Sequence, residues 1–80
     1  MNRDELRRAL EREGIRESAY DLEPGRLTDE QHCLAIVDGG WSVWYAERGH
    51  RRDEVLFDTE DEACSELLLR LVKDPTTRRY

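Results

Sequence analysis

The sequence lacks the features of a membrane-spanning, secreted or disulfide-stabilised protein. No apolar run approaches the ~20 residues that a transmembrane helix requires. The first residues, MNRDELRRAL, are charged from the start and contain no apolar stretch of the kind found in secretory signals. Cys33 and Cys64 are too few and too far apart to form a disulfide framework. We therefore expect a cytoplasmic protein with reduced, largely buried thiols.

Patterns that carry chemistry are also scarce. The cysteines, with His32 and His50, show no paired spacing such as CxxC or HxxxH, so we expect no metal site. His32 and Cys33 are adjacent, and neighbouring side chains of a strand point to opposite faces, so they cannot form a nucleophile–base pair. No dinucleotide-binding, phosphate-loop, nucleophile-elbow or zinc-protease motif occurs. The sequence indicates a protein that is not an enzyme and needs no cofactor.

Acidic residues are present in excess. The chain has 80 residues, with 19 Asp and Glu against 13 Lys and Arg, which gives a formal net charge of −6. An acidic chain repels a phosphate backbone, so nucleic acid is an improbable main ligand, whereas a basic protein partner is compatible. The acidic residues are densest in residues 21–30 and 58–62. We expect no membrane partner, and a monomer or weak homodimer.

Two segments have the pattern of amphipathic helices. Residues 2–14 begin with a capping Asn2 and end at Gly14, the residue type favoured in a left-handed C-terminal position, with Ile15 placed to contact Leu10. Residues 58–75 begin with a Thr59-to-Glu62 capping box and should end near Lys73, because Pro75 follows. The spacing of apolar residues in this second segment predicts a broad buried face.

Extended segments lie between these helices. Residues 32–38, 41–48 and 53–58 are strand-like, residues 19–22 are a possible short edge strand, and residues 23–30 are rich in turn formers. We predict a single α+β domain spanning residues 1–80, in which a helix, a three- or four-stranded antiparallel β-meander and a second helix follow one another. Both helices should pack on one sheet face, and residues 74–80 should form a polar tail.

The aromatic stretch GWSVWYAERG sets the predicted register. A two-residue turn at Gly39 and Gly40 would place Ile36 opposite Val43. The second hairpin has two candidate registers. A two-residue turn at Gly49 and His50 would place Val43 opposite Leu56 and leave Phe57 outside. A three-residue loop, residues 48–50, would place Val43 opposite Val55 and Trp41 opposite Phe57 with these side chains facing the helices, and we favour it because it buries Phe57.

The same register puts Trp44 and Leu56 on the outer face of the sheet. An exposed apolar pair with a polar rim is a candidate recognition surface, with Trp44 as its anchor, although Trp44 as a half-buried strand partner covered by Arg side chains is the more common arrangement. The candidate charged contacts are Asp58, Glu60 and Asp61, followed by Asp21, Glu23, Asp29 and Glu30.

Basic residues are concentrated at one predicted hairpin tip. Arg48, Arg51 and Arg52 could grip phosphate, and they define an alternative in which the protein binds nucleic acid or a nucleotide. Acidic neighbours at Glu47 and Asp53 favour instead a solvated tip or pairing within the chain.

Residues 40–78, GWSVWYAERGHRRDEVLFDTEDEACSELLLRLVKDPTTR, resemble a family of small actinobacterial proteins. The shared pattern is a tryptophan strand ending in E-R-G, a helix start T-E-D-E-A-C and a closing D-P-T-T-R, and DELRRALEREGI near the N-terminus is similar too. Such proteins are encoded beside secreted polymorphic toxins, so the resemblance implies an immunity protein that binds and neutralises a cognate toxin by occlusion. It implies no catalytic residues. A small interaction or regulatory module that pairs as a homodimer or binds another protein is a further alternative.

Overall fold

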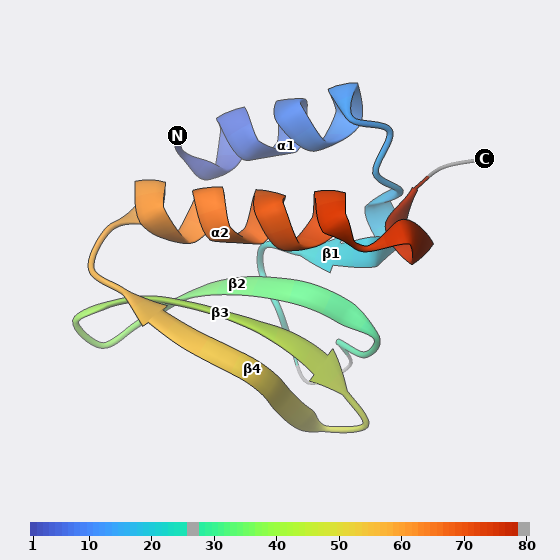
Figure 1. Ribbon diagram of the computed structural model, residues 1–80. Helices are drawn as coiled ribbons and strands as arrows, with labels where there is room; N and C mark the ends of the chain where they lie inside the picture. The colour runs from blue at the N-terminus through green and yellow to red at the C-terminus, as the bar shows by residue number, and fades with distance from the viewer. Residues whose placement is uncertain (26–27, 79–80) are drawn as a thin grey trace.

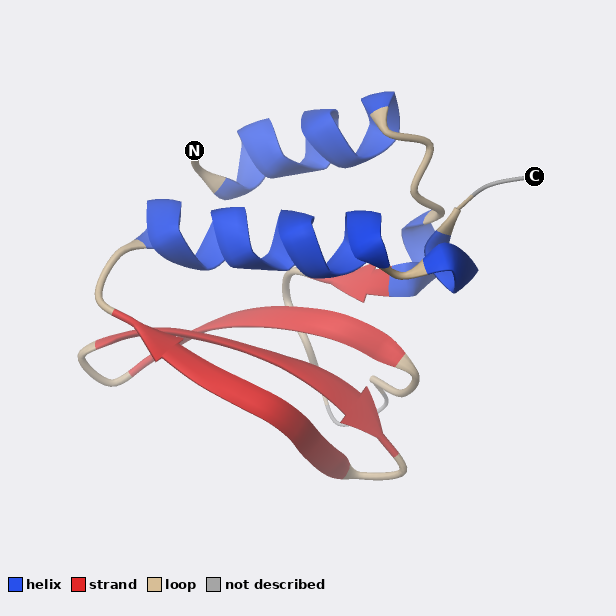
Figure 2. Ribbon diagram, viewed as in Figure 1, coloured by secondary structure: helices blue, strands red, loops and turns tan. Residues whose placement is uncertain are grey.

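The computed structural model describes residues 1–25 and 28–78, and it places two α-helices, two short 3₁₀ helices and four strands there (Figures 1 and 2). The elements follow one another as α1 (Arg3–Arg12), η1 (Glu17–Ala19), β1 (Tyr20–Asp21), β2 (Gln31–Val37), β3 (Gly40–Glu47), β4 (His50–Phe57), α2 (Glu60–Lys73) and η2 (Pro75–Thr77). The predicted α+β class and the helix–strands–helix order are confirmed.

The sheet is mixed rather than wholly antiparallel. Its strand order is β1-β2-β3-β4, and β2, β3 and β4 form the predicted antiparallel meander. β1 instead runs parallel to β2, with Tyr20 opposite His32, and it is shorter than the predicted residues 19–22. Parallel neighbours need a connection that runs back along the sheet, and the turn-rich residues 22–30 supply it. Within that predicted loop, Arg26 and Leu27 lie outside the described residues.

Local capping explains both helices. Asn2 and Glu5 form a reciprocal capping box at the start of α1. Gly14 has φ +73°, and the Ile15 N–H donates to the Leu10 carbonyl at 3.0 Å, which is the predicted Schellman ending. The Thr59 side chain accepts from the Glu62 N–H at the start of α2, which ends at Lys73 as predicted.

Both helices lie on one side of the sheet (Figure 1). α2 contacts β2, β3 and β4, whereas α1 makes its main contacts with α2. Leu34 and Val43 from the central strands are fully buried in one cluster with Leu67 and Leu71 of α2. Ile36, which the sequence placed in this inner set, is 63% exposed because it lies at the turn end of β2.

The β2–β3 register differs from the prediction by two residues. Asp38 and Gly39 form the turn, so Ile36 pairs with Trp41 and Leu34 pairs with Val43. Gly40 belongs to β3, where a Cβ atom would come within 2.4 Å of the Phe57 carbonyl oxygen. The close approach of β4 therefore requires a glycine inside the strand. A shift of two residues keeps every side chain on its predicted face.

The β3–β4 pairing combines a tighter turn with a bulge. Trp41 pairs with Phe57 and Val43 with Val55, as predicted. The connection, however, is a two-residue turn of Arg48 and Gly49, both with positive φ as in a type I′ turn. The register shifts between Val43 and Tyr45, opposite a bulge where Asp53 has φ +53°. The bulge supplies the residue that the predicted three-residue loop would have contained.

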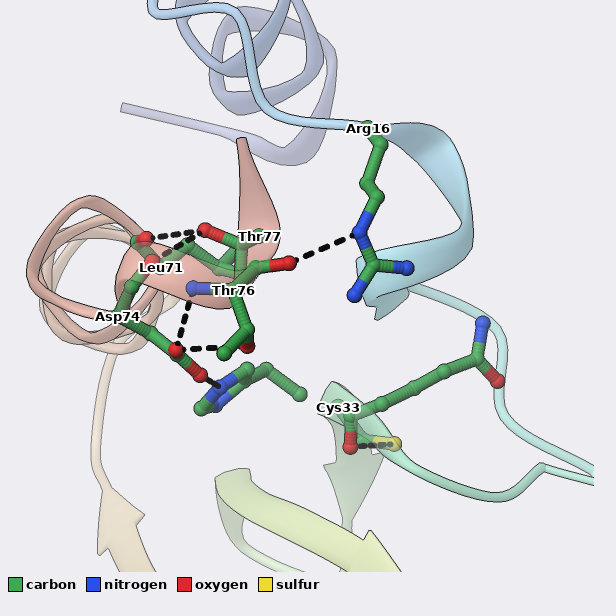
Figure 3. Close-up of polar contacts among 8 residues, drawn as sticks. Arg16, Cys33, Leu71, Asp74, Thr76 and Thr77 are labelled. Carbon is green, nitrogen blue, oxygen red and sulfur yellow. Dashed lines mark hydrogen bonds and ion pairs between the residues drawn. The ribbon is translucent and has the colours of Figure 1, made fainter. Parts of the chain in front are cut away.

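The C-terminal segment is packed, contrary to the predicted polar tail. Thr77 is buried, and its hydroxyl donates to the Leu71 carbonyl at 2.6 Å (Figure 3). The Asp74 carboxylate accepts from the Thr76 N–H at 2.9 Å and lies 3.2 Å from His32 Nε2. Hydrogen bonds from Thr76 hold the pKa of Asp74 below its usual value. Residues 75–78 are thus tied to the domain, and the rest of the predicted tail, Arg79 and Tyr80, lies outside the described residues.

Candidate functional site

Trp44 is not an exposed anchor. Its side chain points to the outer face of the sheet as predicted, but only 5% of it is exposed. It forms a small second cluster with Cys33 and Ala46, and the Arg51 guanidinium stacks 3.9 Å from its ring centroid. This burial corrects the prediction of a Trp44 recognition site, because a covered ring cannot contact a partner without rearrangement.

The connection from β1 to β2 reaches the same part of the outer face. Pro24, Gly25 and Thr28 line a hollow together with Trp44 and Arg51. Asp29 fixes this connection to the hairpin tip, since its carboxylate accepts from the Arg48 N–H at 2.8 Å. The outer face therefore has two halves, of which the half near the Arg48–Gly49 turn is partly covered.

The other half of the outer face has no helix over it (Figure 1). Its cross-strand row runs from Ala35 through Ser42 to Leu56, which is 68% exposed as predicted. Ser42 is buried and donates a hydrogen bond to the Glu54 carboxylate. Val37, Leu56 and Asp58 are called here the Leu56 surface, and Ala35 adjoins it from the Trp44 cluster.

Of the predicted acidic contacts near α2, only Asp58 makes no hydrogen bond or ion pair within the described chain. Asp61 instead pairs with the N-terminal ammonium group of Met1. Glu60 accepts from the Arg3 main-chain N–H at 3.0 Å and lies 3.6 Å from the Arg3 guanidinium. Glu60 and Asp61 therefore hold the start of α1 against α2, while the exposed Asp58 carries a charge that a partner can meet.

The predicted second-tier acids serve the β1–β2 connection. Asp21 accepts hydrogen bonds from the Glu23 N–H and the Thr28 hydroxyl, each at 2.9 Å. Glu23 lies 4.0 Å from the Arg7 guanidinium, and Glu30 adopts a positive φ of 52° directly after Asp29. These residues do not gather with Asp58 into one surface. Asp29 lies at the hairpin tip, whereas Glu23 lies beside α1 and lines a hollow with Arg3 and Glu60.

The arginines of the hairpin tip are engaged within the chain. Arg51 stacks on Trp44 and donates to the Glu54 carboxylate at 2.8 Å. Arg52 lies 3.8 Å from the Glu47 carboxylate. Hydrogen bonds from Ser42 and Arg51 hold the pKa of Glu54 below its usual value. Two of the three candidate phosphate contacts thus already have a carboxylate partner.

The two thiols have the properties of core residues. Cys33 and Cys64 are buried and unpaired, and burial raises their pKa values to about 12 and about 11, respectively. Both thiols therefore stay protonated at neutral pH and are poor nucleophiles. Across residues 1–25 and 28–78, no group of three or more His, Cys, Asp or Glu side chains is placed to hold a metal ion.

The bulge of β4 and its contact with α2 were not predicted from the sequence. Arg70 of α2 donates to the main-chain carbonyl of Asp53 at 2.8 Å, and the bulge sits at that same residue. A Gly at the bulge would have indicated a positive φ, but Asp53 stands in a run of charged strand residues. Val37 was likewise not predicted as a site residue, and it is part of the Leu56 surface because it lies half-buried on the outer face of β2.

Comparison of the chain with protein families, with characterised proteins and with solved structures finds no match. Neither helix in the described part of the chain is both long enough and apolar enough to cross a membrane.

Proposed function

We propose that this protein is an immunity protein that binds a cognate secreted toxin and neutralises it by occlusion. The observation that carries the proposal is the Leu56 surface, an exposed apolar side chain beside an unpaired acid on a bare half of a sheet. The resemblance of residues 40–78 to proteins encoded beside secreted toxins supports the same function. The proposal needs no catalytic group in this chain, which agrees with its protonated, buried thiols.

Leu56 takes the anchoring role that was predicted for Trp44. Burying a leucine side chain at an interface contributes roughly 1.5–3 kcal/mol of transfer free energy. Asp58 and the net charge of −6 favour encounter with a basic toxin surface, because complementary charge raises association rates. In this complex the Leu56 surface and the strands around it would cover the toxin, which is how occlusion neutralises it.

Co-expression with the secreted protein encoded beside this gene tests the proposal. We expect the unmodified chain to restore growth and to form a stable complex on gel filtration. Leu56→Asp should abolish both effects, whereas Leu69→Asp should preserve them, because Leu69 is a 48% exposed leucine on α2 rather than on the sheet. If no neighbouring secreted protein binds the unmodified chain, the immunity function is wrong.

Light scattering on the purified chain tests the homodimeric module. A stable dimer that buries Leu56 would favour that alternative over toxin binding. A monomer leaves the Leu56 surface available for a different protein, as the immunity function requires.

A further inference from the structure

β4 forms a long unpaired edge of the sheet. It lies at the opposite side of the sheet from β1 and has 8 residues against the 2 of β1. The residues from His50 to Leu56 are all exposed. An edge strand of this kind presents main-chain N–H and C=O groups that another strand can pair with.

The bulge divides this edge into two halves. At Asp53 the chain has φ +53°, and the Asp53 carbonyl already accepts a hydrogen bond from Arg70 at 2.8 Å. A bulge twists an edge and interrupts its ladder, so one added strand cannot pair along the whole of β4. The half of the edge between His50 and Asp53 is therefore unsuited to pairing with another strand. The half beyond the bulge has regular strand geometry and can pair.

Beyond the bulge, the main chain of Leu56 faces outward. The Phe57 carbonyl oxygen points at Gly40 of β3, where it would lie 2.4 Å from an added Cβ atom. Successive carbonyls of a strand alternate in direction, so the N–H and C=O of Leu56 face the open edge. The Leu56 side chain, 68% exposed, and that of Val55, 42% exposed, flank these free groups on the two faces.

Charge decides which strand fits there. Glu54 and Leu56 lie on the outer face, and Asp58 follows at the same spacing. Two copies of β4 paired antiparallel about Leu56 would set Glu54 of one copy against Asp58 of the other, a destabilising like-charge contact. Asp58 exerts the stronger attraction on a cation, because Glu54 already pairs with Arg51.

We propose that residues 54–58 accept an added β-strand from a basic partner protein, in which basic, apolar and basic side chains stand opposite Glu54, Leu56 and Asp58. This inference rests on the proposed function and specifies how the partner engages the chain. Main-chain hydrogen bonds to Leu56 would provide affinity, and the alternating side chains would provide selectivity.

A short synthetic peptide tests the edge directly. The probe is an acetylated and amidated peptide with lysine, valine and lysine at every second position and threonine at the positions between them. A matched peptide has glutamate in place of each lysine. In NMR titrations of the isotope-labelled protein we expect the lysine peptide to shift the Leu56 amide and to slow its hydrogen exchange at least about tenfold. The glutamate peptide should do neither. Equal effects of both peptides, or none, would overturn the inference.

Two variants separate the edge from the face. Leu56→Pro removes an N–H that faces the open edge, and proline is tolerated on edge strands, so the domain should stay folded and lose peptide binding. Leu56→Val keeps the N–H and an apolar side chain and should retain binding. If Leu56→Pro does not fold, Asp58→Lys serves instead, and it should reduce binding of the lysine peptide at least about tenfold.

The outcomes for the edge and for the function are distinct. Full growth protection by a folded Leu56→Pro variant would overturn the added strand and leave the immunity function standing. Peptide binding at Leu56 without protection from the neighbouring toxin would leave the edge site and refute the function. The protection of the Leu56 amide against exchange can also be measured without peptide at several protein concentrations. If this protection increases with protein concentration, a second copy of the chain is the occupant of the edge and the inference is overturned.

Discussion

The two tryptophans of β3 lie three positions apart, on opposite faces of the sheet and each beneath an arginine. Trp41 faces the helices, yet it is only partly buried, with the Arg3 guanidinium 5.5 Å from its ring centroid. Trp44 faces away from the helices and is 5% exposed, with Arg51 at 3.9 Å. The face of a strand therefore gives the direction of a side chain but not its exposure. Exposure depends on which other segments reach that face.

Truncation of each ring gives the largest expected difference between the two faces. Trp44→Ala removes a buried side chain, and such changes cost about 3–5 kcal/mol. Trp41→Ala should cost clearly less, because part of that ring is in solvent already. Urea unfolding followed by circular dichroism measures both free energies of unfolding. If Trp44→Ala is tolerated while Trp41→Ala unfolds the domain, the assignment of cover on the two faces is wrong.

The arginine over each ring provides a finer test. Arg51→Met keeps an unbranched side chain but removes the cation from Trp44, and we expect a loss of about 1 kcal/mol. Arg3→Met should cost less, since the Arg3 guanidinium lies farther from the Trp41 ring than Arg51 lies from the Trp44 ring. A double-mutant cycle that pairs each change with the corresponding Trp→Phe isolates the ring contact from the ion pair. Equal coupling energies for the two pairs would contradict the difference between the faces.

Acid should weaken the cover of Trp44, because Glu54 holds the arginine that stacks on this ring. The pKa of Glu54 is lowered in the folded protein by hydrogen bonds from Ser42 and Arg51. A carboxyl of this kind stabilises the fold above its unfolded pKa of ~4.3, and that contribution is lost as pH falls through the lower folded value. Glu54→Gln should therefore flatten the fall in stability below about pH 4.3. The effect is small, because the Glu54 side chain is 35% exposed and water screens it. Unfolding curves collected across this pH range give the slope.

Local signals in the sequence were sufficient for the helices. The Asn2 and Thr59 caps, the Schellman ending at Gly14 and the stop before Pro75 depend on residues a few positions apart, and each is present as predicted. The predicted box at Thr59 is only half formed, because Glu62 accepts from the Thr59 hydroxyl rather than from its main-chain N–H. The faces of the strands were also predictable, because side chains alternate with a period of two and a register shift of two preserves them.

The candidate site was less predictable. Asp58 and Leu56 could be selected from pattern alone, but Glu60 and Asp61 gave no sign that Met1 and Arg3 would engage them. Those contacts join positions about sixty residues apart, and no local rule reports them. The position of Thr77 likewise depends on a distant contact, because the Arg16 side chain donates to the neighbouring Thr76 carbonyl. The buried Thr77 hydroxyl in turn donates to the Leu71 carbonyl.

The bounds of the helices, the strand residues that face them and the interior position of the thiols were predictable from the residues alone. These properties follow from capping chemistry and from side-chain periodicity, both of which act over a few residues. Only the tertiary structure decided the parallel pairing of β1, the bulge at Asp53 and the burial of Trp44. Each of these depends on segments that are distant in sequence and meet only in the folded chain. That is why Leu56, rather than Trp44, is the exposed apolar residue on the outer face.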